Sequence, residues 1–196
     1  MKILICPSDP LDPVWELTRF HPDLTFPDWC FGFYGMTSYG GNAGTRSVPT
    51  SSLSKDGVIF VGSRVRCLDI TDGSNNTLLF GERFHHDLGY EHQRPDVAPA
   101  LPPMAGWGRW AFVAAPGTSG NVSLSTPVRI NYLVPSGGNN SAMTDRVCAF
   151  GSGHPGGANF AFADGNVRFV SDQIPLAVLQ ALSTRARGEV VSASDY

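Results

Sequence analysis

The alternation of apolar and polar residues is clearest near the C-terminal end of the chain. An Asp164-Gly165 pair stands in its middle, and this dipeptide favours the two-residue turn of a β-hairpin. Apolar side chains alternate with small or polar ones on both sides of it, at Phe160, Phe162, Val167 and Phe169. The pattern predicts a β-hairpin over residues 158–170.

Four other apolar runs predict strands. Residues 57–70 alternate, and residues 77–84 form a second run after a polar, turn-rich loop. Two shorter runs, 128–134 and 147–150, bracket a loop rich in Gly and Asn at 135–141. We therefore expect a sheet built from short segments.

One helix is predicted, close to the C-terminus. Asp172 can cap it, Pro175 suits its first turn and Gly188 can terminate it. Residues 85–106 are polar and then rich in Pro, which predicts a long surface loop. The fold class expected is α+β, with a mostly antiparallel sheet, long loops and one C-terminal helix in a single domain over residues 1–196.

Composition narrows the functional classes. The 196 residues include 22 Gly and 15 Pro, too many for a helical bundle, while 42% hydrophobic residues suffice for a core. A net charge of -3 with 14 scattered basic residues argues against nucleic acid as a partner. No apolar run reaches the ~18 residues of a membrane span, and the N-terminus lacks the apolar region of a signal peptide. These features predict a soluble protein.

The cysteines leave two possibilities open. None is spaced as C-x-x-C, which excludes a zinc ribbon and a thioredoxin motif. Two disulfides and four buried thiols are both compatible with Cys6, Cys30, Cys67 and Cys148.

A family resemblance begins at His154, which is followed by nine residues and then by Asp164-Gly165. Further motifs are Cys-Pro-Ser-Asp-Pro at 6–10 and the segments 38–44, 56–60 and 66–83. In this order they resemble the prepilin-type H-x9-DG family, a bacterial family of unknown function related to type II secretion pseudopilins. The resemblance implies a pseudopilin-like head fold.

The same resemblance bears on location. Members usually begin with a prepilin leader and a long hydrophobic helix, and this sequence resembles the globular head alone. The family implies the cell envelope, whereas a chain without signal or anchor would be cytoplasmic if Met1 is the native start.

A calcium site is one candidate for the chemistry. Asp72, Ser74 and Asn76 place side-chain oxygens at positions 1, 3 and 5 of a loop, and Glu82 could add a carboxylate. Major pseudopilins, which the family resembles, bind calcium in a loop of the head. The alternative is a polar turn in which Asp72 and Asn76 accept hydrogen bonds from local backbone N–H groups.

His154 and Asp164 are candidate acid/base residues. A strand advances ~3.3 Å per residue, so the strand between them would separate them by about 16 Å. They can form a catalytic pair only if the Gly-rich segment folds back. Otherwise Asp164 belongs to the hairpin turn and His154 fixes the loop by hydrogen bonds.

Three other patterns are weaker evidence for a functional site. Residues 151–156 fit G-x-G-x-x-G, but a strand follows where a dinucleotide site needs a helix. Trp107 and Trp110 could bind a carbohydrate, although such pairs more often anchor a core. The densest cluster of polar groups has no zinc signature and predicts a solvated loop; it comprises His85, His86, Asp87, Glu91 and His92.

Two functions follow from these candidates. The first is a calcium-binding, pseudopilin-like domain with a structural role and a surface for protein partners. The alternative is a calcium-dependent hydrolase of small esters or lactones, in which the cation polarises the carbonyl and His154 or Asp164 takes a proton from water.

Overall fold

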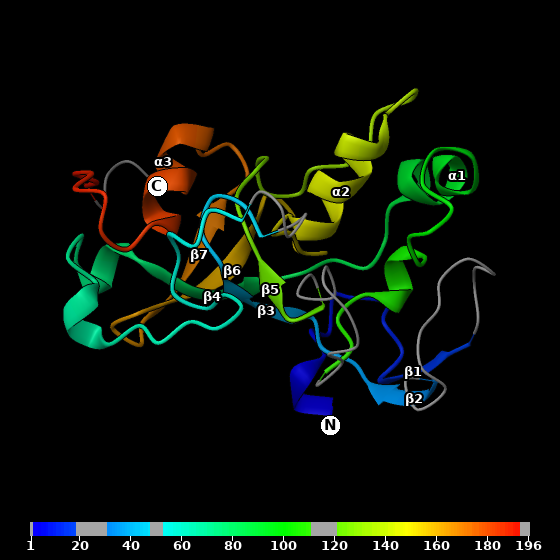
Figure 1. Ribbon diagram of the computed structural model, residues 1–196, viewed down its shortest axis with the longest axis horizontal. Coiled ribbons are helices and arrows are strands. Elements are labelled where there is room, and N and C mark those ends of the chain that lie inside the picture. The colour runs from blue at the N-terminus through cyan, green and yellow to red at the C-terminus, as the bar shows by residue number, and fades with distance from the viewer. Residues whose placement is uncertain (1, 19–30, 48–52, 111–120, 193–196) are drawn as a thin grey trace.

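The computed structural model describes residues 2–18, 31–47, 53–110 and 121–192, and a five-stranded sheet lies at its centre. The strands stand in the order β5, β3, β4, β6, β7 (Figure 1). Neighbours are antiparallel, except that β3 and β5 run parallel. The strands are β3 (Tyr39–Asn42), β4 (Leu78–Glu82), β5 (Ser123–Leu124), β6 (Gly157–Phe162) and β7 (Val167–Ser171).

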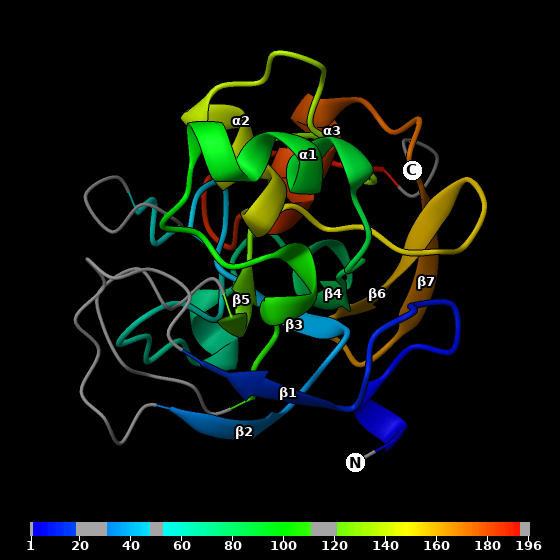
Figure 2. The same ribbon diagram turned by 90° about the vertical axis from the view of Figure 1, so that its right-hand side faces the viewer.

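Three α-helices and a smaller sheet complete the described part of the chain. In both views the helices lie above the five-stranded sheet, and the antiparallel pair β1–β2 lies below it (Figures 1 and 2). The fold is therefore α+β, as expected. The elements are β1 (Val14–Leu17), β2 (Gly32–Gly35), α1 (Leu88–Val97), α2 (Asn140–Cys148) and α3 (Leu176–Ser183).

The described residues also contain four short 3₁₀ segments: η1 (Lys2–Leu4), η4 (Cys67–Asp69), η5 (Ser74–Asn76) and η6 (Met104–Gly106). Within the described residues, no helix has both the length and the apolar character that crossing a membrane requires.

The predicted hairpin is confirmed as β6 and β7, which pair from Gly157↔Ser171 to Ala161↔Val167. Phe160 and Phe162 are fully buried on the face that α3 covers, where they pack with Leu179 and Leu182. The opposite face of this hairpin is open, since Phe169 is 51% exposed. The alternation in the sequence therefore separates a core face from an outer face.

The prediction of a single helix is wrong. Residues 85–106, expected as a surface loop, contain α1, whose first turn is capped by Asp87 accepting a hydrogen bond from the Tyr90 backbone N–H. Residues 140–148 form α2, capped by Asn139, where a loop and the beginning of a strand were expected. Both helices are mostly polar, and they are joined by an ion pair between Arg146 Nε and Asp87 Oδ2 at 2.9 Å.

Two predicted strands, 57–70 and 128–134, are absent from the structure. The backbone N–H groups of Val58 and Ile59 donate to Asn42 O, and the Arg185 side chain donates to Gly57 O, so this segment follows the sheet without joining its ladder. The C-terminal helix is confirmed, but it begins after Pro175 and Asp172 does not cap it.

Candidate metal centre

Three segments far apart in the sequence meet on the outer face of the five-stranded sheet. Cys6 follows η1, Glu82 ends β4 and His154 lies in the loop before β6. The distances are 3.3 Å from Cys6 Sγ to Glu82 Oε1, 3.4 Å from Cys6 Sγ to His154 Nε2, and 3.4 Å from His154 Nε2 to Glu82 Oε1. In the described part of the chain, no other group of three such side chains lies this close together. We call these three residues the ligand triangle.

The strand alternation directs Glu82 to the outer face. A Cβ on Gly81 would approach Phe150 and Phe160 to 2.6 Å, so position 81 faces the core and position 82 faces away from it. One carboxylate oxygen of Glu82, Oε2, accepts hydrogen bonds from Asn159 N at 2.6 Å and from Asn159 Nδ2 at 3.2 Å. The other oxygen, Oε1, is thereby turned toward the thiol and the imidazole.

Cys6 is held by the turn that follows it. Its carbonyl accepts from the Asp9 backbone N–H at 3.0 Å, and Ser38 N donates to Leu4 O at 2.8 Å. Ser8 Oγ lies 3.1 Å from the Cys6 sulfur. The Cys-Pro-Ser-Asp-Pro motif is thus a turn that places the thiol, which is only 3% exposed, against β4.

Asp9 fastens this turn to the sheet. Its Oδ2 lies 2.6 Å from His85 Nδ1 and accepts from Ser38 Oγ at 2.7 Å, while Oδ1 accepts from the His85 backbone N–H. Burial favours a higher pKa for the Asp9 carboxyl, but the hydrogen bonds and the charge of His85, with the bond from Ser38, hold this pKa below its ordinary value. The other ring nitrogen of His85 lies 3.0 Å from Trp107 O.

The loop that carries His154 packs over the N-terminal turn. A Cβ on Gly153 would approach Ser8 O to 2.1 Å, so only glycine allows this contact. Ser152 Oγ accepts from the His154 backbone N–H at 3.0 Å and donates to Gly157 O at 2.6 Å. The His154 side chain is 35% exposed, against 3% for that of Glu82, so solvent reaches the triangle from the histidine side.

The triangle has the dimensions of a zinc-type site. Bonds of about 2.3 Å to sulfur and about 2.0–2.2 Å to nitrogen or oxygen, arranged as a tetrahedron, place sulfur about 3.5–3.7 Å from the other ligand atoms and place nitrogen and oxygen about 3.3–3.6 Å apart. The observed nitrogen–oxygen side of 3.4 Å agrees with this, and the two sulfur sides, at 3.3 and 3.4 Å, are slightly shorter. Thiolate, imidazole and carboxylate together suit zinc-type cations better than calcium, which prefers oxygen ligands alone.

A hydrolytic Cys-His-Glu triad requires a different arrangement. In a triad the carboxylate contacts one ring nitrogen of the histidine and the nucleophile contacts the other. Here the Cys6 sulfur and the Glu82 oxygen both face Nε2 of His154. The three atoms therefore converge on one point, as ligands do, and do not form a relay.

The residues predicted as calcium ligands are divided between two places. Both oxygens of Asp72 accept backbone hydrogen bonds at 2.8 Å, from Arg187 N and Gly188 N. Asn76 Nδ2 donates to Val191 O, so this loop is tied to the C-terminal segment. Ser74 lies in the same loop as part of η5. Glu82 belongs to the ligand triangle.

His154 and Asp164 lie at opposite ends of β6. Both oxygens of Asp164 accept from Asn166, at 3.0 Å from the backbone N and at 2.8 Å from Nδ2. These bonds lower the pKa of the exposed Asp164 carboxyl. Its place is the one expected for a hairpin turn residue, whereas His154 meets Glu82 and Cys6.

The prediction of a solvated loop for the histidine-rich cluster is wrong for its central members. His85 is 6% exposed and Asp87 is 3% exposed, because they pair with Asp9 and Arg146. Glu91 Oε1 accepts from the Met104 backbone N–H. Only His86 and His92 are exposed as expected.

Sequence reasoning did not identify Cys6 as a ligand. Cys6, Cys67 and Cys148 are free thiols, and Cys30 lies outside the described residues. Cys67 is exposed and Cys148 is buried, so Cys6 differs from both in facing a histidine and a carboxylate. The motif at residues 6–10 was the available signal.

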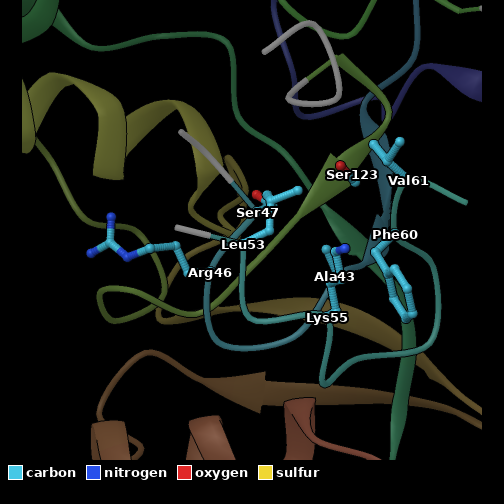
Figure 3. Close-up of a pocket in the computed structure, with 8 residues that line it drawn as sticks. All are labelled: Ala43, Arg46, Ser47, Leu53, Lys55, Phe60, Val61 and Ser123. Atoms are coloured by element: carbon cyan, nitrogen blue, oxygen red, sulfur yellow. The ribbon is translucent and has the colours of Figure 1, made fainter. Parts of the chain in front are cut away.

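A hollow elsewhere on the molecule is lined by none of the three residues of the ligand triangle. It is shallow and lies between the end of β3, β5 and the segment 53–61 (Figure 3). Arg46 at its rim pairs with Asp145, and Ser47 forms a hydrogen bond with Ser125.

The two tryptophans considered for carbohydrate binding differ in exposure. Trp107 is buried in the core between α1 and α2, whereas Trp110 is 54% exposed.

Comparison with known proteins gives one match. Residues 1–177 match the model of a family described as "Protein of unknown function (DUF1559)". Searches among curated proteins and among solved structures found no match.

Proposed function

Since this chain belongs to the DUF1559 family of unknown function, we propose from its geometry that it is a metal-binding domain with Cys6, Glu82 and His154 as ligands of a zinc-type divalent cation. The observation that carries the proposal is the convergence of Sγ, Oε1 and Nε2 at 3.3 to 3.4 Å. The cation would join the N-terminal turn, the end of β4 and the loop before β6. Its first role would be to stabilise the contact among these three segments.

The surroundings of the triangle support the proposal. Asn159 fixes the orientation of the Glu82 carboxylate, as outer hydrogen-bond partners do at metal sites. The resemblance to the H-x9-DG family agrees, because His154 is the histidine of that motif and Cys6 is the cysteine of Cys-Pro-Ser-Asp-Pro. A pseudopilin-like head with partner proteins remains part of the proposal.

Zinc binding by the full chain tests this function. A competition titration against a chromophoric chelator should give one tight site per chain, and His154→Gln should weaken it by on the order of 100-fold. His92→Gln is the matched control, because His92 is exposed on α1 and does not belong to the ligand triangle. Equal affinity of both variants, or no tight site in the parent chain, would refute the proposal.

Calcium and ester hydrolysis remain predictions that the same samples can test. A Ca²⁺ titration of the parent chain and of Asp72→Asn examines the loop at 72–76. Hydrolysis of small esters and lactones, with and without chelator, examines the enzymatic alternative with His154→Gln and Asp164→Asn. Activity that is indifferent to the chelator and to both variants would exclude the hydrolase mechanism.

A further inference from the structure

A second hollow lies beside helix α2 and has a volume of about 210 Å³. Its walls come from the segment after β4, the segment 131–133, α2 and the segment 150–152. None of the three residues of the ligand triangle lines it. We call it the α2 hollow, and its apolar lining consists of Phe84, Tyr132, Leu133 and Phe150.

The segment 131–134 gives the α2 hollow a fixed wall, because hydrogen bonds fasten it at both ends. Asn131 N donates to Phe150 O at 3.1 Å, and Asn131 Oδ1 accepts from Ser152 N at 2.8 Å. At the other end, Val134 N donates to Asp87 Oδ2 at 3.0 Å. Tyr132 and Leu133 lie between these two anchors, and both border the hollow.

The guanidinium of Arg146 supplies a hydrogen-bond donor in this apolar lining. Nε donates to Asp87 Oδ2 at 2.9 Å, and Nη2 donates to Phe84 O and His86 O. Among the residues that the structure describes, Nη1 has no hydrogen-bond partner, and it is not sealed from solvent. Since only 3% of the Arg146 side chain is exposed and this residue lines the hollow, we place the free N–H groups of Nη1 at the hollow.

The other polar side chains of the lining are already committed. Asn131 Nδ2 donates to Asp172 Oδ2 at 3.2 Å, and Ser152 Oγ donates to Gly157 O and accepts from His154 N. Nη1 of Arg146 is therefore the one polar contact that the described side chains of the lining leave for a ligand.

The charges favour a neutral acceptor over an anion. Arg146 is paired with Asp87, and these side chains are 3% and 1% exposed, so the buried pair has no net charge. A ligand carboxylate would meet the charge of Asp87 and would lose its hydration in a mostly apolar hollow. A neutral carbonyl oxygen accepts from Nη1 without this cost.

The volume limits the ligand to about one ring. A cavity of about 150 Å³ accepts benzene, so 210 Å³ admits a ring with a small substituent, whereas larger ligands need pockets of about 300 Å³ or more. We propose that the α2 hollow binds a neutral, single-ring molecule whose carbonyl oxygen accepts a hydrogen bond from Nη1 of Arg146. The ring packs against Phe84, Tyr132 and Phe150.

Benzamide is the probe that tests this inference, followed by amide chemical shifts of the full chain in the presence of a metal chelator. The shifts of Gly151 and Ser152 should change saturably. Benzamide should bind about tenfold more tightly than aniline, which has a neutral ring without a carbonyl, because a hydrogen bond from a charged donor is lost. It should also bind at least about threefold more tightly than benzoate, whose carboxylate must be desolvated.

A variant of the wall tests the position of the ligand. Leu133→Ala should weaken benzamide binding about threefold, because the ligand loses apolar contact. Leu68→Ala is the matched control, since Leu68 is 86% exposed on η4 and does not line the hollow. Its benzamide affinity should equal that of the parent chain.

Three results would overturn the inference. Absence of saturable shifts at Gly151 and Ser152, or equal affinity of Leu133→Ala and the parent chain, would exclude the α2 hollow as the site. Aniline binding as tightly as benzamide would exclude Arg146 as the donor, and benzoate binding as tightly would exclude the preference for a neutral ligand. Because chelator is present throughout, none of these results depends on the ligand triangle.

Discussion

Glu82 and Asp72 are two carboxylates that the sequence placed in one metal site and that the structure treats differently. Both oxygens of Asp72 accept backbone N–H bonds from the C-terminal segment. Glu82 has one oxygen bound to Asn159 and presents the other to Cys6 and His154. A carboxylate oxygen that accepts no backbone hydrogen bond and lies beside a thiol and an imidazole therefore indicates a metal ligand. The spacing of oxygen-bearing residues in a loop is a weaker indicator.

The largest effect on zinc affinity should come from Glu82, with the same kind of change at Asp72 as its control. Glu82→Gln replaces the charged oxygen at the cation by a neutral one and should weaken zinc binding by on the order of 100-fold or more. Asp72→Asn should leave zinc affinity unchanged. Chelator competition measures both, and a loss of zinc affinity in Asp72→Asn alone would reverse the comparison.

Asn159 should have the next largest effect. Asn159→Ala removes the bond from Nδ2 to Glu82 but keeps the shorter bond from the backbone N–H. Zinc affinity should therefore fall by about tenfold, the lower end of the range for outer partners of metal ligands. Asn166→Ala, which removes the equivalent bond to Asp164 in the hairpin turn, is the control and should leave zinc affinity unchanged.

Acid should loosen the turn that carries Cys6. The pKa of Asp9 is lowered in the folded protein, so its contribution to stability is complete above the unfolded value of 3.8 and is lost as pH falls toward the folded value. Urea unfolding at a series of pH values should show stability decreasing below pH 3.8 in the parent chain. The decrease should be shallower in Asp9→Asn, and identical slopes would contradict the role given to this carboxylate.

The smallest effect should be that of Asp72 on stability. Asp72→Asn leaves one acceptor oxygen for the two backbone donors, so unfolding should become easier by about 0.5–1 kcal/mol. Denaturation without metal measures this change. An effect several times larger would mean that the loop contributes more than its two backbone bonds.

Local sequence signals predicted the parts of the fold that depend on neighbouring residues. The Asp164-Gly165 turn with alternating Phe residues identified β6 and β7, and Pro175 marked the start of α3. Helices α1 and α2 were not predicted from the sequence because their surfaces are mostly polar. They are held by a hydrophobic cluster that includes Tyr90 and Met143 and by a buried ion pair between Asp87 and Arg146, 59 residues apart.

The ligand triangle could likewise be predicted only in part, because its residues are distant in sequence. Glu82 and His154 were recognised as candidates, but each was assigned to a different partner. Cys6 is 76 residues from Glu82 and 148 from His154, so their meeting depends on the turn at Asp9 and on the packing of Gly153 against Ser8. No periodicity along the chain encodes contacts of that range.

The ligand set can be measured directly by X-ray absorption at the zinc edge of the loaded chain. We expect one sulfur at about 2.3 Å and nitrogen or oxygen neighbours at about 2.0–2.1 Å, with the sulfur lost in Cys6→Ser and retained in Cys67→Ser. A first shell of oxygen and nitrogen alone in the parent chain, or one unchanged in Cys6→Ser, would contradict the assignment of Cys6, Glu82 and His154 as the metal centre.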